Sequence, residues 1–149
     1  MAVIVGVVSG GLVVVGGAVT EEVVVVEATD GTELLSVPVD DDDTVVLAYT
    51  HSVEKTPVRD IYTVRDGELV MTRMEFSSFG AGLPADADVD RTDDGRFSYE
   101  PTSPREGDLL VATGTIAGHE LIVEGERYDL VELADAGSVR ITVTTRLRI

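Results

Sequence analysis

The segment His51-Ser52-Val53-Glu54-Lys55-Thr56-Pro57 gathers side chains that could bind a ligand or take part in a reaction. Lys55 is the only lysine in the chain, since arginine supplies the other basic side chains, and His51 is one of two histidines. A lysine ammonium and a histidine N–H, with backbone N–H groups beside them, can hold a carboxylate or a phosphate. The first hypothesis for this segment is therefore an anion-binding site.

The same segment has the spacing of a serine hydrolase motif. In Ser52-Val53-Glu54-Lys55 the serine and the lysine stand three residues apart, which on one turn of helix places the lysine amine beside a nucleophilic hydroxyl. The context opposes a helix, because Pro57 disfavours helical geometry at Thr56 and a strand pattern comes directly before the segment. The partner motifs of penicillin-recognising enzymes are also missing. We therefore keep an extracytoplasmic hydrolase only as an alternative hypothesis.

A metal-dependent enzyme is a further alternative. His51, Glu54 and Asp60 offer an imidazole and two carboxylates, a ligand set compatible with zinc, iron or manganese. No recognised spacing supports their convergence, and the ammonium of Lys55 would repel a cation. The second histidine, His119, stands at the start of a predicted strand, where we expect an exposed loop residue. We expect no cofactor.

A structural role is the plainest interpretation of the segment. Glu54 and Lys55 could pair with other charged side chains while His51 bonds the backbone, which would fix the turn between two strands. Such a network would stabilise the fold without binding a ligand. The residues themselves leave the structural role and anion binding open.

The sequence around the segment predicts an all-β domain, either an antiparallel β-sandwich or a partly open barrel of about eight strands. From Val23 onward, short β-branched runs alternate with tight-turn dipeptides, without a long stretch of helical periodicity. Asp30-Gly31 and Asp66-Gly67 are typical of type I′ hairpin turns. The predicted strands cover residues 23–29, 34–39, 44–50, 58–65, 68–78, 109–113, 120–124, 128–133 and 138–146.

A two-residue loop at Asp66-Gly67 would fix the register of its hairpin. Tyr62 then lies opposite Met71, and Asp60 lies opposite Arg73. We therefore predict a cross-strand ion pair between Asp60 and Arg73.

Two acidic stretches have no predicted strand. Residues 81–107 are rich in Asp, Pro, Gly and Ser and predict a long loop, which is either functional or simply solvated. Residues 40–43 are consecutive aspartates, whose side chains alternate in direction along an extended chain and converge poorly on a cation. We interpret the aspartate run as a solvated turn.

The N-terminal segment predicts contact with a membrane. Residues 2–19 carry no charge, and the stretch reaches the roughly 17 residues that a bilayer span requires. We expect a hydrophobic helix over residues 1–20, either a signal peptide or a membrane anchor, followed by a single β domain over residues 21–149. The acidic remainder favours a domain outside the cytoplasm, held at the cell membrane or secreted.

Composition excludes several classes of protein. The chain has 28 acidic and 11 basic residues, and its formal net charge of -17 at pH 7 argues against nucleic acid and anionic membrane surfaces as partners. This acidity, with arginine in place of lysine, is typical of proteins from salt-loving organisms. The absence of cysteine excludes a disulfide framework, a thiol nucleophile and a zinc–thiolate site.

Two motifs resemble a known family. The tract Leu47-Ala48-Tyr49-Thr50-His51-Ser52-Val53-Glu54-Lys55-Thr56-Pro57-Val58, with Asp60 and Tyr62 after it, is followed by Ser78-Phe79-Gly80-Ala81-Gly82-Leu83-Pro84. In order and separation, these motifs are similar to the family catalogued as domain of unknown function 1850. The similarity is strong over residues 44–84 and looser over the rest of the exported part.

The resemblance implies a transport role without an assigned biochemical activity. Members look like small exported or membrane-anchored proteins, often encoded beside the fused permease and TAXI-type binding protein of tripartite ATP-independent periplasmic (TRAP) transporters. The implied function is a non-catalytic accessory of solute uptake, which docks onto the transporter or holds a small anionic solute. Gly80 and Gly82 permit a sharp reversal that could meet the His51 turn. The candidate docking or binding residues are His51, Ser52, Glu54, Lys55, Thr56, Asp60, Arg73, Gly80 and Gly82.

Overall fold

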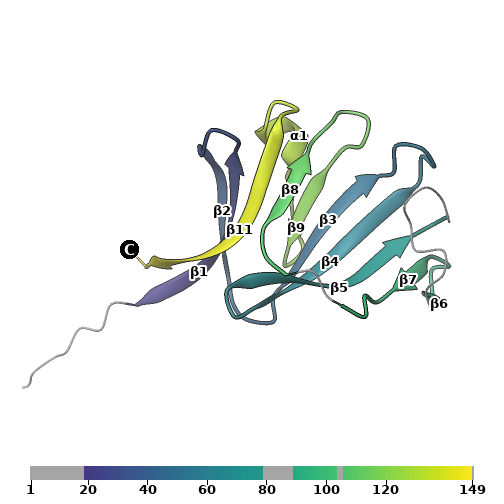
Figure 1. The fold of residues 1–149 in the computed structure, drawn as a ribbon, viewed down its shortest axis with the longest axis horizontal. Coiled ribbons are helices and arrows are strands. Elements are labelled where there is room, and N and C mark those ends of the chain that lie inside the picture. Colours follow the sequence, from purple (N-terminus) through teal and green to yellow (C-terminus); the bar gives the residue numbers. More distant parts are fainter. Residues whose placement is uncertain (1–18, 79–88, 104–105, 149) are drawn as a thin grey trace, which may run out of the picture.

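In the computed structural model of this chain, the described residues are nearly all β, with two antiparallel sheets that face one another and one short helix (Figure 1). It describes residues 19–78, 89–103 and 106–148. The predicted N-terminal helix lies almost wholly outside the described residues, as do Gly80 and Gly82. Within the described ranges, no helix is long and apolar enough to cross a membrane.

One sheet has four strands, and its centre is the pairing of the first strand with the last. Its order is β2 (Glu33–Val39), β1 (Thr20–Ala28), β11 (Ser138–Leu147) and β8 (Leu109–Ala112). β1 and β11 pair over the full length of β1, from Thr20 opposite Leu147 to Ala28 opposite Val139. The four valines at 23–26 are all buried, as suits β-branched side chains in a strand with a neighbour on each side.

The other sheet has seven strands and carries the motif segment. Its order is β10 (Glu126–Asp129), β9 (Glu120–Val123), β3 (Thr44–Thr50), β4 (Pro57–Arg65), β5 (Glu68–Phe76), β7 (Phe97–Tyr99) and β6 (Val89–Arg91). Residues 51–56 are the connection between β3 and β4, two central strands. The long loop predicted over residues 81–107 is wrong in its described part, because the short hairpin β6–β7 extends the sheet there.

The inner faces of the two sheets share one hydrophobic core. Alternate residues of each strand point inward, so Val24 and Ile141 of one sheet join Val45, Leu69 and Leu121 of the other, each no more than 1% exposed. The strands do not close into a barrel. The predicted all-β sandwich is thus confirmed, with eleven described strands in place of about eight.

The predicted strand over residues 128–133 is wrong in its second half. β10 ends at Asp129, and residues Leu130–Leu133 form the short helix α1. The Asp129 carboxylate accepts hydrogen bonds from the backbone N–H groups of Val131 and Glu132, at 2.8 and 3.0 Å. An aspartate that satisfies the first free N–H groups of a helix favours helix over strand, and Leu130 is then fully buried.

The two predicted type I′ turns have different outcomes. Asp66 and Gly67 both have positive φ, 51° and 76°, as that turn requires. Between β1 and β2 only Gly31 has positive φ, at 85°, and the connection runs from Thr29 to Thr32. The Asp30 carboxylate accepts a hydrogen bond from the Thr32 N–H at 2.9 Å, which supports a wider turn.

The predicted ion pair between Asp60 and Arg73 is wrong, because a β-bulge interrupts the β4–β5 hairpin. Tyr62 lies opposite Met71 as predicted, but the register then shifts by one residue. Asp60 therefore faces Met74, while Arg73 stands opposite Ile61. A one-residue shift moves side chains to the other face of a sheet, which places Asp60 and Arg73 on opposite faces.

Candidate functional site

The motif segment folds into a turn closed by its own backbone. The N–H of His51 donates to the carbonyl of Thr56 at 2.8 Å, and the N–H of Lys55 donates to the carbonyl of His51 at 2.9 Å. The His51 ring adds to this closure, since its Nδ1 accepts from the N–H groups of Val53 and Glu54, both at 3.3 Å. The predicted structural role of His51, bonding the backbone at a turn, is confirmed.

The residues at the tip of this turn point into solvent. Ser52 and Lys55 are exposed, and Val53 is 65% exposed, which is unusual for a large apolar side chain in a small domain. Lys55 has φ of 54°, in the left-handed region that side chains other than glycine rarely adopt. Among the described residues, neither Glu54 nor Lys55 forms an ion pair, so the described contacts do not explain the lysine as a structural partner.

The two family motifs meet at one hydrogen bond. The hydroxyl oxygens of Thr56 and Ser78 lie 3.2 Å apart, which joins the last residue of the turn to the first residue of the glycine-rich motif. Gly80 and Gly82, which the sequence predicted to meet the His51 turn, lie outside the described residues. Thr56 is therefore the member of the candidate set that links both motifs.

Asp60 lies inside the sandwich, away from the exposed turn. It is 8% exposed and lines a cavity of about 510 Å³ between the sheets, with Leu47, Tyr62 and, at its rim, Glu106 and Asp108. The Tyr49 side chain lies beside this carboxylate. Burial raises the pKa of Tyr49, and the negative charge of Asp60 raises it further. Tyr49 therefore remains protonated beside Asp60.

His119 is half-buried against Tyr49, whereas the sequence predicted an exposed loop residue. The two rings stack with centroids 5.4 Å apart and planes inclined by 25°. Burial lowers the pKa of His119, because a charged imidazole loses hydration there. The carbonyl of His119 also accepts the N–H of Leu130, which fixes the start of α1.

An arginine cluster on the outer face of the seven-stranded sheet was not predicted from the sequence. Glu75 has a side chain only 10% exposed, and three guanidinium groups surround it. The distances are 3.3 Å from Arg73, 3.5 Å from Arg96 and 3.9 Å from Arg59. The alternation of side chains along β4 could have predicted that Arg59 lies on the outer face, opposite to the inward-facing Val58 and Tyr62. The positions of Arg73 and Arg96 could not be predicted in this way, because they depend on the bulge and on the β5–β7 pairing.

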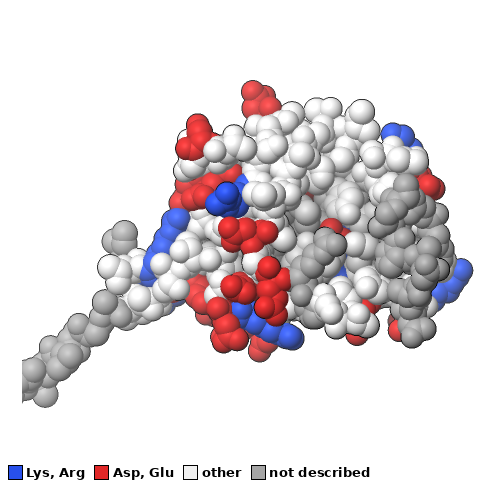
Figure 2. Space-filling model, viewed as in Figure 1, with Lys and Arg blue, Asp and Glu red and all other residues white. Residues whose placement is uncertain are grey.

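A groove of about 380 Å³ lies beside this cluster and next to the motif turn, whose flanking residues Thr50 and Pro57 line it. Arg59 and Arg96 line it on one side, and Arg127 of β10 lines it on the other. Ala48 and Ile122 supply apolar lining. Several basic side chains therefore gather at this groove, whereas the rest of the described surface is strongly acidic. Figure 2 shows that acidity on another face, where Asp and Glu side chains gather on the side of the four-stranded sheet.

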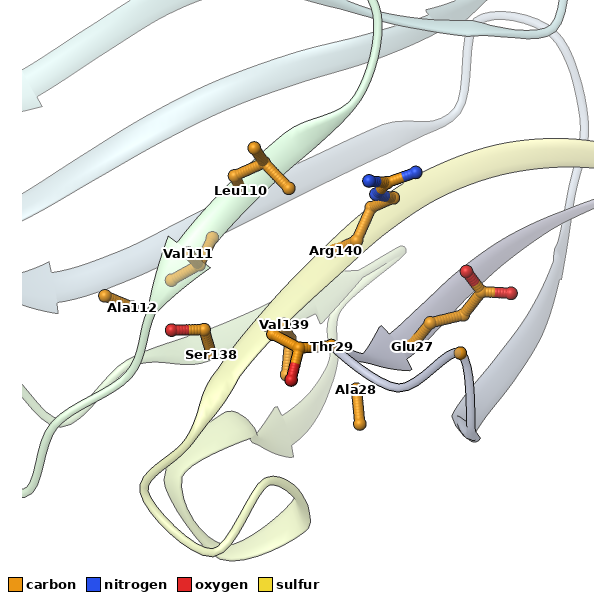
Figure 3. A pocket seen from close by; sticks show the side chains of 10 residues that line it. Glu27, Ala28, Thr29, Leu110, Val111, Ala112, Ser138, Val139 and Arg140 are labelled. Carbon is orange, nitrogen blue, oxygen red and sulfur yellow. The ribbon is translucent and has the colours of Figure 1, made fainter.

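A second surface cavity lies far from the motif residues in the sequence. It has a volume of about 480 Å³ on the four-stranded sheet, between the ends of β1, β8 and β11 (Figure 3). Leu110, which is 76% exposed, lies on one side of it, and Glu27 and Arg140 stand opposite each other in the β1–β11 register. None of the candidate residues predicted from the sequence lines this cavity.

The described geometry departs from both enzymatic hypotheses. Residues 51–56 form a turn that leads into β4, whereas the serine–lysine arrangement uses a turn of helix. Among the described residues, no three His, Asp or Glu side chains converge as metal ligands, so His51, Glu54 and Asp60 are not brought together as a metal site. What the segment offers is a rigid exposed turn with a charged tip.

Comparison with known proteins identifies a family. The family model described as Domain of unknown function (DUF1850) matches residues 45–130, which run from β3 to the first residue of α1 and contain both motifs. Neither the curated proteins nor the solved structures contain a match to this chain.

Proposed function

The chain belongs to the DUF1850 family, and from this membership and the geometry of the motif turn we propose that it is a non-catalytic accessory of a TAXI-type TRAP solute transporter. In this proposal the β domain lies outside the cytoplasm, and the N-terminal segment attaches it to the membrane or directs its export. The exposed turn over residues 51–56 contacts the transporter's permease.

The observation that supports docking is an exposed motif turn that its own hydrogen bonds close. Backbone hydrogen bonds and the His51 ring fix the turn, so little conformational entropy is lost when a partner binds it. The turn nevertheless presents Val53 and Lys55 to solvent, where neither contributes to the core. A family motif that is ordered but not buried is typical of a recognition surface.

A neighbouring loop enlarges this surface. The N–H of Thr50 donates to the carbonyl of Ala117 at 2.7 Å, which holds the loop between β8 and β9 against the end of β3. Ile116 on that loop is 75% exposed. Val53 and Ile116 thus supply apolar contact area on the two loops beside the charged Lys55, a combination that suits a protein partner better than a small polar solute.

The proposal is tested by affinity capture from native membranes with tagged full-length protein. We expect wild type to recover the TAXI-type permease, identified by mass spectrometry, and Lys55→Gly to recover much less. Lys55→Gly removes the charge while its φ of 54° suits glycine. Arg140→Ala, an exposed change on the other sheet, is the matched control and should capture the permease normally.

Two results would overturn the docking proposal. One is recovery of no transporter component by wild type. The other is equal recovery by wild type and Lys55→Gly, which would show that the motif turn is not the contact.

A further inference from the structure

We propose that the groove lined by Arg59, Arg96 and Arg127 binds a small organic carboxylate that carries a short apolar group. This inference does not depend on the docking proposal, because it rests on other side chains, those of the groove on the outer face of the seven-stranded sheet beside the motif turn, and on a different kind of ligand. It follows from the charge balance of the groove, the unused donors of one arginine and the apolar lining.

The arginines converge on the groove from different strands. Arg59 belongs to β4, Arg96 directly precedes β7, and Arg127 belongs to β10 at the other side of the sheet. A guanidinium presents a planar fork of donors that matches a carboxylate. Ten arginines and one lysine are spread over the whole chain, so three arginines at one groove are a local concentration of positive charge in a chain of net charge -17.

The carboxylates around the cluster leave positive charge in excess. Arg127 is held by Glu120 at 2.8 Å, and Arg96 forms hydrogen bonds to Asp94. Glu75 is shared among three guanidinium groups. In total, four arginines face three carboxylates. The arginines are Arg59, Arg73, Arg96 and Arg127, and the carboxylates are those of Glu75, Asp94 and Glu120. The excess of one positive charge matches a singly charged anion.

Of the three arginines that line the groove, Arg59 is the one whose donors are least used by neighbouring carboxylates. Its ion contact to Glu75 is 3.9 Å long, beyond hydrogen-bond distance. Its Nε is buried and has no hydrogen-bond partner in the part of the chain that the structure describes. A buried donor without a partner is costly and rare in folded proteins. The Arg59 side chain as a whole is 35% exposed, so a carboxylate in the groove would contact this guanidinium through its terminal N–H groups. Arg59 is therefore the principal anion-binding residue of the proposed site.

The rest of the lining selects the kind of anion. Ala48 and Ile122 line the groove, and Ile122 is 7% exposed within a small apolar cluster on this outer face. Apolar lining next to a cation favours a ligand with a hydrocarbon group attached to its carboxylate. A phosphate dianion would leave that lining in contact with water and would exceed the available positive charge, and Glu120 would repel it. A volume of about 380 Å³ suits a small molecule.

The test is calorimetric titration of purified full-length protein in mild detergent, with ionic strength held constant by NaCl. The probes are hexanoate, inorganic phosphate and hexanol, which has the same hydrocarbon tail without the charge. We expect saturable binding of hexanoate, weaker binding of phosphate and none of hexanol. Saturable hexanoate binding to Lys55→Gly would separate this site from the docking turn.

Variants locate the site. Arg59→Gln should weaken hexanoate binding by about tenfold, the effect of losing one charge-assisted contact. Arg127→Gln should also weaken hexanoate binding. The Arg127 side chain is 63% exposed, so this change should not disturb folding. Arg91→Gln is the matched control, since Arg91 stacks on Phe97 outside the groove. The inference is wrong if both groove variants bind hexanoate as wild type does, if hexanol binds equally well, or if phosphate binds more tightly.

Discussion

The Tyr49 side chain lies beside the buried carboxylate of Asp60, diagonally across the β3–β4 pairing just inside the motif turn. Both residues belong to the family motif, yet they lie on the inner face of the sheet while Lys55 lies in solvent. The motif therefore combines a buried polar contact that holds the end of the sheet with an exposed turn that is free to contact a partner.

Tyr49→Phe is predicted to destabilise the fold. It removes the hydroxyl beside a carboxylate that is 8% exposed, and loss of a polar neighbour from a buried group typically costs about 1–3 kcal/mol in the free energy of unfolding. Chemical denaturation measures this loss. Tyr128→Phe, at a half-buried tyrosine packed against the same core, should lose clearly less. Equal losses would show that the Asp60 contact is not the cause.

Glu75→Gln is predicted to lower the free energy of unfolding by about 1–3 kcal/mol. This is less than the loss expected from breaking a fully buried ion pair, because the arginine partners of Glu75 are partly exposed. The change leaves three guanidinium groups without the carboxylate they share. Since salt screens repulsion among them, the loss should shrink as NaCl is raised. Glu100→Gln, at an exposed site, is the control. A loss that is independent of salt would contradict the electrostatic explanation.

Lys55→Gly is predicted to raise stability by about 0.5–1 kcal/mol, because glycine adopts positive φ without strain. Lys55 has φ of 54°, whereas Val53, in the same turn, does not have positive φ. Val53→Gly should accordingly lower the free energy of unfolding by a similar amount, because glycine gives the unfolded backbone more conformational entropy. Thermal melts of the two variants measure the contrast. A fall in melting temperature for Lys55→Gly would instead favour a structural network that involves the lysine.

Gly137→Ala is predicted to destabilise the connection from α1 to β11. A Cβ at this position would lie 2.9 Å from the backbone carbonyl oxygen of Ala134, which cannot move without disturbing the turn. Overpacking of this kind costs about 1–3 kcal/mol. Gly114→Ala is the matched control, since a Cβ there meets nothing within 4 Å. Denaturant midpoints of the two variants should therefore differ.

His119 is predicted to make the fold less stable in mild acid. Because burial lowers its pKa from the ordinary value of 6.5, the folded state favours the neutral ring. The contribution of the neutral His119 ring to the free energy of unfolding is therefore present above about pH 6.5. It is lost as the pH falls through the lower pKa of the folded state. His119→Phe keeps a ring against Tyr49 without titrating, so its melting temperature should fall less between about pH 7.5 and about pH 5.5. Identical pH slopes would show that another group is responsible.

Local sequence patterns were sufficient for much of the fold. The β-branched runs and the Asp66-Gly67 turn predicted the β3, β4 and β5 strands almost to the residue, because hydrophobic alternation and positive-φ turns depend on neighbours along the chain. The same patterns missed α1, where one capping aspartate outweighed a strand-like run. They also missed β6 and β7, whose three-residue lengths leave too little pattern to detect.

The sequence by itself determined that this chain is an acidic, cysteine-free all-β protein, and its two motifs identified the family. The tertiary structure decided which residues can act together. A single bulge at Thr72 placed Arg73 and Glu75 together on the face opposite Asp60, where Arg59 also lies. The pairing of β7 with β5 brought Arg96 to the same carboxylate. Register and strand order depend on contacts between residues far apart in the chain, so no local pattern encodes the arginine groove.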